Sequence, residues 1–292
     1  MKENKIWNDY LPEDMQEHWT VYECLKESED SSTFLVKETV TGILCVLKWG
    51  RNRQAEFLRN EMEIMEKMAD RKLSGIPKTY RIFEENGEVY LVREYIEGMS
   101  LAQMVLQKGG ISEAEICRIS RKICQTAEQF QNPDEPMIHR DIKPENIVVT
   151  PGGEVVFIDF GTMRSYKKDG SRDTFVVGTR GTAAPEQYGY TQTDQRTDVY
   201  AIGQTMLYMV SESYEKNQLS ECAVSRRMKK IIEKACSFEP DKRYGDAAQL
   251  RRAVEKCQAN NRKKVYKKAG AVFGLIAAAV SYTHLTLPTK LE

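Results

Sequence analysis

The chain has 292 residues, of which 41% are hydrophobic, and its 43 basic and 43 acidic residues give a formal net charge of zero. This length and apolar content can bury a sizeable core, and the neutral balance argues against a nucleic-acid partner held by a broad basic surface. The seven cysteines contain no Cys-x-x-Cys pair, which argues against a zinc ribbon or a redox motif and fits a reducing cytosol.

The first clear elements are a strand followed by a helix. Residues 43–48 form an apolar run that ends in a single cation, Lys48, and this pattern predicts a strand. Residues 54–68 space their apolar side chains along one helical face, with charged residues between them. A lysine after a strand is ordinarily a solvated edge residue, so these two elements alone assign no function.

A hairpin is predicted farther along the chain. Residues 147–150 and 155–158 are two β-rich runs, and the connection between them is Pro-Gly-Gly-Glu. The residues that flank the hairpin, Asn146 and Asp159, should therefore lie close together at its open end.

The two motifs around this hairpin are the most informative part of the chain. Residues 138–146 read Ile-His-Arg-Asp-Ile-Lys-Pro-Glu-Asn, and residues 159–161 read Asp-Phe-Gly. Each motif alone is usually a solvated loop or a turn. Together, in this order and with a hairpin between them, they resemble the eukaryotic-type serine/threonine protein kinases, the bacterial membrane-anchored kind in particular. The resemblance covers about residues 19–258.

The resemblance implies an α+β fold with two lobes. A small β-rich N-lobe would span about residues 19–95, and a mostly helical C-lobe would span about residues 96–258. The implied reaction is transfer of the ATP γ-phosphate to Ser or Thr hydroxyls of protein substrates. Such a reaction depends on positioning and on neutralising phosphate charge rather than on covalent chemistry by the protein.

The family's catalytic roles fall on residues that match its motifs. Asp141 takes the position of the base that accepts or orients the hydroxyl proton, and Lys143 would lie beside the transferred phosphoryl group. Asn146 and Asp159 would supply oxygen ligands to Mg²⁺, with Mn²⁺ as an alternative metal. The Lys-Pro pair at 143–144 is the serine/threonine form of this loop.

The ATP-binding roles fall mainly on the first third of the chain. Lys48 matches the strand lysine that contacts the α and β phosphates, and Glu61 is assigned as its carboxylate partner. Glu63 is the competing carboxylate and is expected to face solvent. Backbone groups around Glu94 to Ile96 would pair with the adenine edge.

Two positions depart from the family pattern. Arg93 stands where the family usually has an apolar residue behind the adenine pocket, and it is expected either to snorkel or to pair with a carboxylate. The glycine-rich loop should fall at residues 26–33, yet these residues include no glycine. Ser28 and Ser31 stand at the second and third glycine positions, and the loop's three carboxylates would repel phosphates.

The segment after Asp-Phe-Gly carries the regulatory expectations. Arg140 is typical of kinases in which this arginine docks a phosphate added to the segment. Thr174 is the first choice of acceptor, and Thr179 is expected to hydrogen-bond Asp141 and Lys143 instead. The remaining candidate acceptors are Ser165, Tyr166 and Ser171. The alternative is that these hydroxyls are ordinary polar groups of a surface loop with no regulatory role.

Three further residues are expected to stabilise the larger lobe. Glu186, in Ala-Pro-Glu, needs a buried cation, and Arg243 matches the family's partner for it. Asp198 matches the helix aspartate that braces the catalytic-loop backbone.

The end of the chain predicts a membrane tether. Residues 1–18 are expected to be an N-terminal extension without the pattern of a secretory signal, whereas residues 259–268 form a basic juxtamembrane segment. The uncharged residues 269–280 would begin a membrane helix under the positive-inside rule, but twelve helical residues reach only about 18 Å of the roughly 30 Å hydrocarbon core. Residues 281–289 match the translation of a transposase sequencing adapter, so residues 281–292 are interpreted as an artefact that truncates this helix. A helix packed on its own domain and a surface-lying amphipathic anchor are the alternatives.

These patterns predict a serine/threonine kinase whose cytoplasmic catalytic domain is tethered to the membrane and activated by autophosphorylation. The alternative is a pseudokinase that binds partners without turnover, which the glycine-less loop favours. A small-molecule phosphotransferase is disfavoured by the complete segment ending at Glu186. A homodimer formed through the membrane segment is a further hypothesis.

Overall fold

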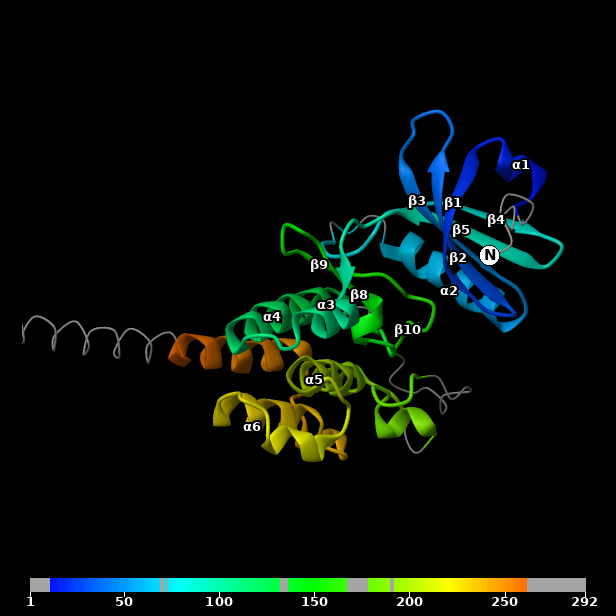
Figure 1. Ribbon diagram of the computed structural model, residues 1–292. Coiled ribbons are helices and arrows are strands. Elements are labelled where there is room, and N and C mark those ends of the chain that lie inside the picture. Colours follow the sequence, from blue (N-terminus) through cyan, green and yellow to red (C-terminus); the bar gives the residue numbers. More distant parts are fainter. Residues whose placement is uncertain are drawn as a thin grey trace, which may run out of the picture.

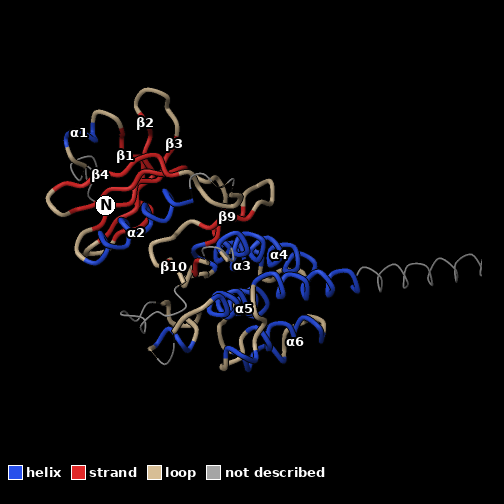
Figure 2. The backbone as a smooth tube through the Cα atoms, turned by 180° about the vertical axis from the view of Figure 1, so that it is seen from behind, coloured by secondary structure: helices blue, strands red, loops and turns tan. Residues whose placement is uncertain are grey.

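The computed structural model describes residues 11–68, 71, 73–131, 136–166, 178–189 and 192–261. A β-sheet with one long helix forms the smaller lobe, and a group of helices forms the larger lobe below it (Figure 1). The reverse view shows the strands gathered in the smaller lobe and the helices in the larger one (Figure 2). The predicted α+β, two-lobed fold is therefore confirmed.

The elements follow the chain in a simple order. The strands are β1 (Trp19–Glu27), β2 (Ser31–Glu38), β3 (Leu44–Gly50), β4 (Thr79–Glu85), β5 (Glu88–Glu94), β6 (Met99–Ser100), β7 (Met137–Ile138), β8 (Ile147–Val149), β9 (Val155–Phe157) and β10 (Arg164–Ser165). The α-helices are α1 (Glu13–Gln16), α2 (Arg53–Met68), α3 (Leu101–Lys108), α4 (Glu113–Phe130), α5 (Gln195–Ser211) and α6 (Arg226–Ala235), and residues 247–261 are also helical. Short 3₁₀ turns occupy Pro144–Asn146, Pro185–Tyr188, Lys216–Ser220 and Pro240–Lys242.

The N-lobe is one antiparallel sheet in the order β1-β2-β3-β5-β4. Its strands alternate between two faces, so that Phe34, Val36 and Leu47 meet in a core on one face while Lys48 points to the other. Leu11 and Met15 are 3% and 1% exposed in that same core. Two apolar side chains of the segment before β1 thus pack into the core of the N-lobe.

Helix α2 packs against the sheet through one face. Ala55, Leu58, Ile64 and Met68 are buried at helical spacing, and Glu61 is buried among them. A carboxylate in this position requires a cation from the sheet, because an unpaired buried charge is costly. This requirement links the helix to β3.

The C-lobe surrounds helix α5. Twelve of its 17 residues are buried, so it has no wide polar face, as expected of a helix enclosed by its neighbours. Helix α4 begins at the N-cap Ser112, whose hydroxyl accepts from the Glu115 N–H, and it buries Cys117 and Cys124 as small apolar side chains. Both helices contact the catalytic loop, residues 138–146, through Phe130 at the end of α4 and Asp198 on α5.

The hairpin predicted after the catalytic loop is present as β8 and β9. Ile147 is paired with Phe157, and the Ile158 N–H donates to the Asn146 carbonyl at 2.9 Å. The hairpin thus brings its flanking residues together at its open end.

Across the described residues, no helix has the length and apolar character needed to cross a membrane, and residues 262–292 lie outside the described part of the chain.

Candidate active site

A cavity of about 450 Å³ lies between the two lobes. The N-lobe contributes Lys48 and Glu61 to its lining, and the C-lobe contributes Asp141, Asp159 and Thr179. Residues from distant parts of the sequence, including most of the predicted catalytic set, therefore face one space.

The carboxylate of Asp141 is held from three sides. Lys143 Nζ lies 2.7 Å from Asp141 Oδ2, the Thr179 hydroxyl donates to Oδ1 at 2.8 Å, and Asn146 Nδ2 donates to Oδ2 at 2.8 Å. Lys143 Nζ also donates to the Thr179 hydroxyl oxygen at 2.6 Å. These bonds hold the Asp141 carboxylate in one orientation at the wall of the cavity.

Asn146 and Asp159 present oxygen atoms at the open end of the β8–β9 hairpin. The Asn146 amide nitrogen makes both of its bonds to Asp141, so the amide oxygen remains as a ligand. The Asp159 side chain is 45% exposed and lines the cavity. One carboxylate and one amide oxygen fit Mg²⁺, which prefers hard oxygen ligands and keeps other positions for water or phosphate.

The charges around Asp159 favour its ionised form. Burial by itself raises the pKa of this carboxyl group, but the Lys48 ammonium, the Gly161 N–H and the Arg93 guanidinium outweigh burial and lower the pKa to about 2. The side chain is therefore a carboxylate at neutral pH.

Lys48 joins the two lobes. Its Nζ lies 2.8 Å from Glu61 Oε2 and 3.4 Å from Asp159 Oδ1. Burial raises the pKa of Glu61, while the Lys48 charge acts in the opposite direction. Glu63 instead pairs with Lys67 on the exposed side of α2.

Sequence reasoning missed a second link between α2 and the C-lobe. The Asn60 amide nitrogen donates to the carbonyl oxygens of Gly161 and Met163 at 2.9 and 2.8 Å. These bonds fasten the helix that carries Glu61 to the segment that follows Asp159. An asparagine within a charged helix carries no sequence signal for such a contact.

Arg93 is buried behind the cavity on β5. Its side chain does not snorkel, because the residue is only 4% exposed and Nε and Nη1 have no hydrogen-bond partner. Burial lowers the pKa of Arg93, while the charges of Glu61 and Asp159 oppose that shift. With Lys48, Arg93 balances the two carboxylates, so this group of four charges, three buried or nearly so and Asp159 partly exposed, is neutral in sum.

The predicted adenine-contacting segment lies where β5 ends. The Glu94 N–H donates to the Lys78 carbonyl at 2.8 Å, and the Glu94 carboxylate accepts from the Lys78 N–H at 3.0 Å. Ile96 follows in the irregular connection between the lobes. Neither Glu94 nor Ile96 lines the 450 Å³ cavity.

The loop without glycine is a tight turn between β1 and β2. The Ser28 N–H donates to the Ser31 carbonyl at 2.8 Å, and the two hydroxyl oxygens lie 2.8 Å apart. Ser31 lines the cavity, whereas Ser28 is exposed and does not. Among the described residues, the only non-glycine residues with positive φ lie elsewhere, so this turn needs no left-handed conformation.

The backbone of the catalytic loop is held from below. The Asp198 carboxylate, fully buried, accepts from the N–H groups of His139 and Arg140 at 3.0 Å each. Arg140 has a φ of 71°, which is rare for a residue with a side chain and is the kind of strained conformation that clusters at functional sites. The His139 ring packs against Phe157 and Phe160, and burial lowers its pKa to about 4, so it is neutral at pH 7.

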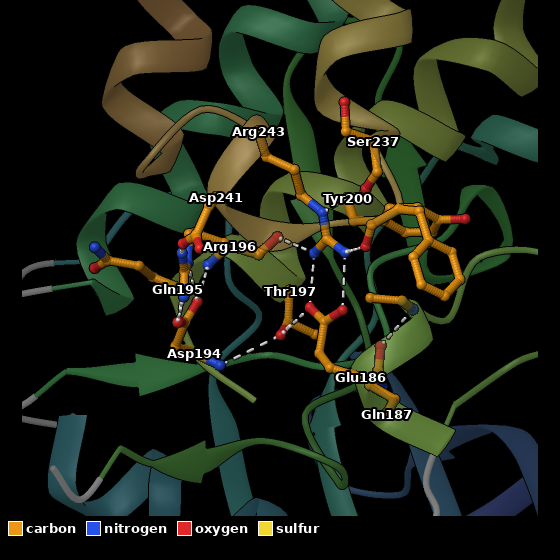
Figure 3. Close-up of polar contacts among 12 residues, drawn as sticks. Glu186, Gln187, Asp194, Gln195, Arg196, Thr197, Tyr200, Ser237, Asp241 and Arg243 are labelled. Atoms are coloured by element: carbon orange, nitrogen blue, oxygen red, sulfur yellow. Dashed lines mark hydrogen bonds and ion pairs between the residues drawn. The ribbon is translucent and has the colours of Figure 1, made fainter. Parts of the chain in front are cut away.

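Glu186 and Arg243 form a fully buried ion pair (Figure 3). The guanidinium donates to both carboxylate oxygens, at 2.6 and 2.8 Å. Its remaining N–H groups donate to backbone carbonyls of Arg196, Ser237 and Phe238. The charge is therefore both paired and hydrogen-bonded, as stability requires of a buried ion pair.

The segment expected to carry regulation is only partly described. Thr174 and Ser171 lie within residues 167–177, outside the described residues. Ser165 lies in the short strand β10, which pairs with β7, and the Tyr166 N–H donates to the Pro136 carbonyl.

Comparison with known proteins identifies the family. Residues 20–264 match the protein kinase domain. The chain is 31% identical over 218 residues to serine/threonine-protein kinase D of Synechocystis, a match that covers 68% of this chain and 42% of that protein. Serine/threonine-protein kinase C of the same organism is 26% identical over 275 residues, covering 82% of this chain and 50% of that kinase.

A third relative is serine/threonine-protein kinase PknB of Mycolicibacterium smegmatis, 30% identical over 184 residues, which are 56% of this chain and 29% of that kinase. The chain thus spans half or less of the length of these curated relatives. Members of this family use ATP with a divalent metal and act on proteins, and the relatives named here are serine/threonine kinases. The chain belongs to the protein kinase family, as its motifs predicted.

Proposed function

We propose that this chain transfers the γ-phosphate of ATP to Ser and Thr hydroxyls of protein substrates, with Mg²⁺ as the metal. The observation that carries the proposal is the three-sided support of the Asp141 carboxylate in the same cavity as the Lys48–Glu61 pair. A base position without its cations, or a strand lysine without its carboxylate, would not support turnover. Here Asp141 has its cation, Lys143, and Lys48 has its carboxylate, Glu61.

Asp141 would act as the base for the acceptor hydroxyl. Its fixed carboxylate can accept or orient the hydroxyl proton, which directs the oxygen lone pair toward the phosphorus. Lys143, 2.7 Å from Asp141, can neutralise negative charge on the transferred phosphoryl group. The Thr179 hydroxyl fixes the positions of Lys143 and Asp141 relative to each other, because it hydrogen-bonds both of them.

The nucleotide would be held from the opposite side. Lys48, oriented by Glu61, is placed to neutralise the α and β phosphates, and the backbone near Glu94 and Ile96 is proposed to receive the adenine. Asn146 and Asp159 would hold Mg²⁺, which when bound draws negative charge from the phosphates. Mn²⁺ has the same oxygen preference and is the alternative metal.

We also propose control by autophosphorylation of Thr174. The argument is the position of Arg140 beside the base, because a guanidinium there can pair with a phosphate on the segment that follows Asp159. Membrane tethering through residues 269–280, a cytoplasmic position for the catalytic domain, and dimerisation through the tether remain proposals that rest on the sequence pattern alone.

The second candidate function is a pseudokinase that binds partners without turnover. It is favoured by one observation, the exposed carboxylates of Glu27 and Glu29 in the loop over the phosphate side of the cavity. Both functions share one fold, so only a measurement of turnover separates them.

The test is incubation of the full chain with radiolabelled ATP, Mg²⁺ and a generic protein substrate, followed by mapping of the label by mass spectrometry. Asp141→Asn should reduce the rate by a factor on the order of 10² to 10⁴, the usual contribution of a general base. Lys48→Met should also abolish the label, whereas Lys67→Met, which alters an exposed lysine of α2, is the matched control. Absence of label in the unaltered chain would favour the pseudokinase.

A further inference from the structure

The loop without glycine is fastened to the connection between β3 and α2. The Arg51 guanidinium donates to the Asp30 carboxylate at 2.9 Å and to the Glu29 carbonyl at 3.1 Å. The Asn52 amide donates to Asp30 at 3.1 Å, and the Arg51 N–H donates to the Asp30 carbonyl at 3.0 Å. Four bonds thus converge on the tip of the turn, which is also closed internally by Ser28 and Ser31.

This fastening changes the charge balance of the loop. Of its three carboxylates, Asp30 is paired with Arg51, so it is not free to repel a phosphate. Glu27 and Glu29 are exposed, and neither lines the cavity. The residues of this region that do line the cavity are Lys26, Ser31, Ser32 and Thr33, a set with one cation and three hydroxyls.

The sheet register places Lys26 in a row with Lys48. Lys26 on β1 is paired with Thr33 on β2, and Thr33 is paired with Lys48 on β3. Residues directly opposite one another in an antiparallel sheet point to the same face, so the two lysines share the face that overhangs the cavity. They are two strand spacings apart, or roughly 10 Å.

Two irregularities in β1 set this row, because the register with β2 shifts between Val21 and Glu23 and again between Cys24 and Lys26. Each bulge reverses the face of the side chains that follow, so the two together leave Lys26 on the face that regular alternation would give. They move it along β2 from Ser31, which is paired with Gly50, to Thr33, which is paired with Lys48. The position that the family motif assigns to the first glycine therefore carries a cation directed at the phosphate side of the cleft.

We propose that Lys26 binds the phosphates of the nucleotide from the loop side, in place of the close backbone approach that glycines would allow. A fixed turn cannot wrap its backbone around a triphosphate, but a lysine stem reaches outward from a fixed strand and brings its charge to the anion. The ligand class is a nucleoside triphosphate, and this inference rests on the proposed use of ATP.

The experiment measures equilibrium binding of ATP, ADP and adenosine to the full chain by calorimetric titration with Mg²⁺ present. Lys26→Gln should weaken ATP binding about 5- to 20-fold, which is the range expected for loss of one charged contact at a partly exposed site. Adenosine binding should be unchanged, because it carries no phosphate, and the ATP difference should shrink at high salt. Lys26→Arg should restore most of the affinity.

Lys37→Gln is the matched control, because Lys37 is an exposed lysine of β2 that does not line the cavity. If Lys26→Gln binds ATP as tightly as the unaltered chain and Lys37→Gln do, Lys26 is an ordinary solvated lysine and the proposal is overturned. An equal loss for adenosine would also overturn it, since the residue would then shape the pocket rather than bind phosphate.

Binding and turnover fail separately in this design. If the unaltered chain binds ATP in a manner that depends on Lys26 but transfers no label, the phosphate contact stands and the kinase proposal fails. If label is transferred while Lys26→Gln changes nothing, the kinase proposal stands and the phosphate contact fails. If the unaltered chain binds none of the three ligands, the phosphate contact is overturned.

Discussion

The two sides of the cavity handle charge in different ways. On the C-lobe side, Asp141, Asp198 and Glu186 are enclosed by donors, and each carboxylate has at least two hydrogen-bond partners. On the loop side, Asp30 and Arg51 are each 43% exposed, and the turn depends on solvated side chains. Removing a partner of a buried carboxylate on the C-lobe side should lower the free energy of unfolding strongly. The exposed ion pair of the loop contributes little, so the loop should tolerate substitution.

The largest test of this contrast is removal of Arg243. Arg243→Met leaves Glu186 buried and unpaired, so we expect the free energy of unfolding to fall by about 3–5 kcal/mol. Urea denaturation at pH 7 measures this loss. The matched control is Arg59→Met, because the Arg59–Glu84 pair is exposed and its loss should change the free energy of unfolding far less.

A double variant, Arg243→Met with Glu186→Gln, should recover part of the lost stability, since it leaves no unpaired charge. Equal effects of Arg243→Met and Arg59→Met would contradict the distinction between the two sides.

The second test is the pH dependence of stability. Burial lowers the pKa of His139 to about 4 in the folded chain, with Asp141 and Asp159 acting in the opposite direction. In the unfolded chain the pKa is near its ordinary value of about 6.5, so the unfolded state binds more protons between these values. The contribution of His139 to the free energy of unfolding should therefore fall by up to about 3 kcal/mol as the pH drops from about 6.5 to about 4, while Asp198, whose pKa burial raises to about 6, acts in the opposite direction.

His139→Leu should remove this part of the pH dependence, because leucine does not titrate and the two ring nitrogens make no hydrogen bonds that would be lost. The measurement is a series of urea denaturation curves between pH 4 and pH 7. An unchanged slope in the variant would show that other groups cause the acid sensitivity.

The smallest effect is expected in the loop. Because neither Ser28 nor Ser31 has a positive φ, glycine would bring no conformational relief there, and it would remove the bonds between the two serines. The double variant Ser28→Gly with Ser31→Gly should lose on the order of 1–2 kcal/mol of unfolding free energy and should not bind ATP more tightly. A gain in ATP affinity would mean that the turn hinders nucleotide binding.

Local sequence was sufficient to predict that two residues lie close together where a single hairpin positions both of them. The hairpin from 147 to 157 brings Asn146 and Asp159 together because its register is set by two short apolar runs and a Pro-Gly-Gly turn. The partners Lys48 with Glu61 and Glu186 with Arg243 could be named from motif order, and both pairs exist as contacts, while their roles in function stay predictions. The choice of Glu61 over Glu63 followed from the family pattern and from the usual exposure of helix carboxylates.

Other contacts could not be predicted because they depend on how separate elements meet. Asn60 reaches two carbonyls about a hundred residues away, and Leu11 with Met15 completes a core whose other members lie on several strands. For Arg93 the sequence left two alternatives, snorkelling or pairing with a carboxylate, because its balance with Glu61 and Asp159 requires α2 and the segment after β9 to lie against β5.

The amino-acid sequence by itself determined the family, the two-lobed α+β fold and the identity of the candidate catalytic residues, because these follow from local periodicity and from short motifs in a set order. Tertiary structure decided how the loop without glycine closes and where Lys26 points. Those outcomes depend on two register shifts between β1 and β2 and on bonds from Arg51 and Asn52, which form only when the turn and the connection between β3 and α2 are packed together.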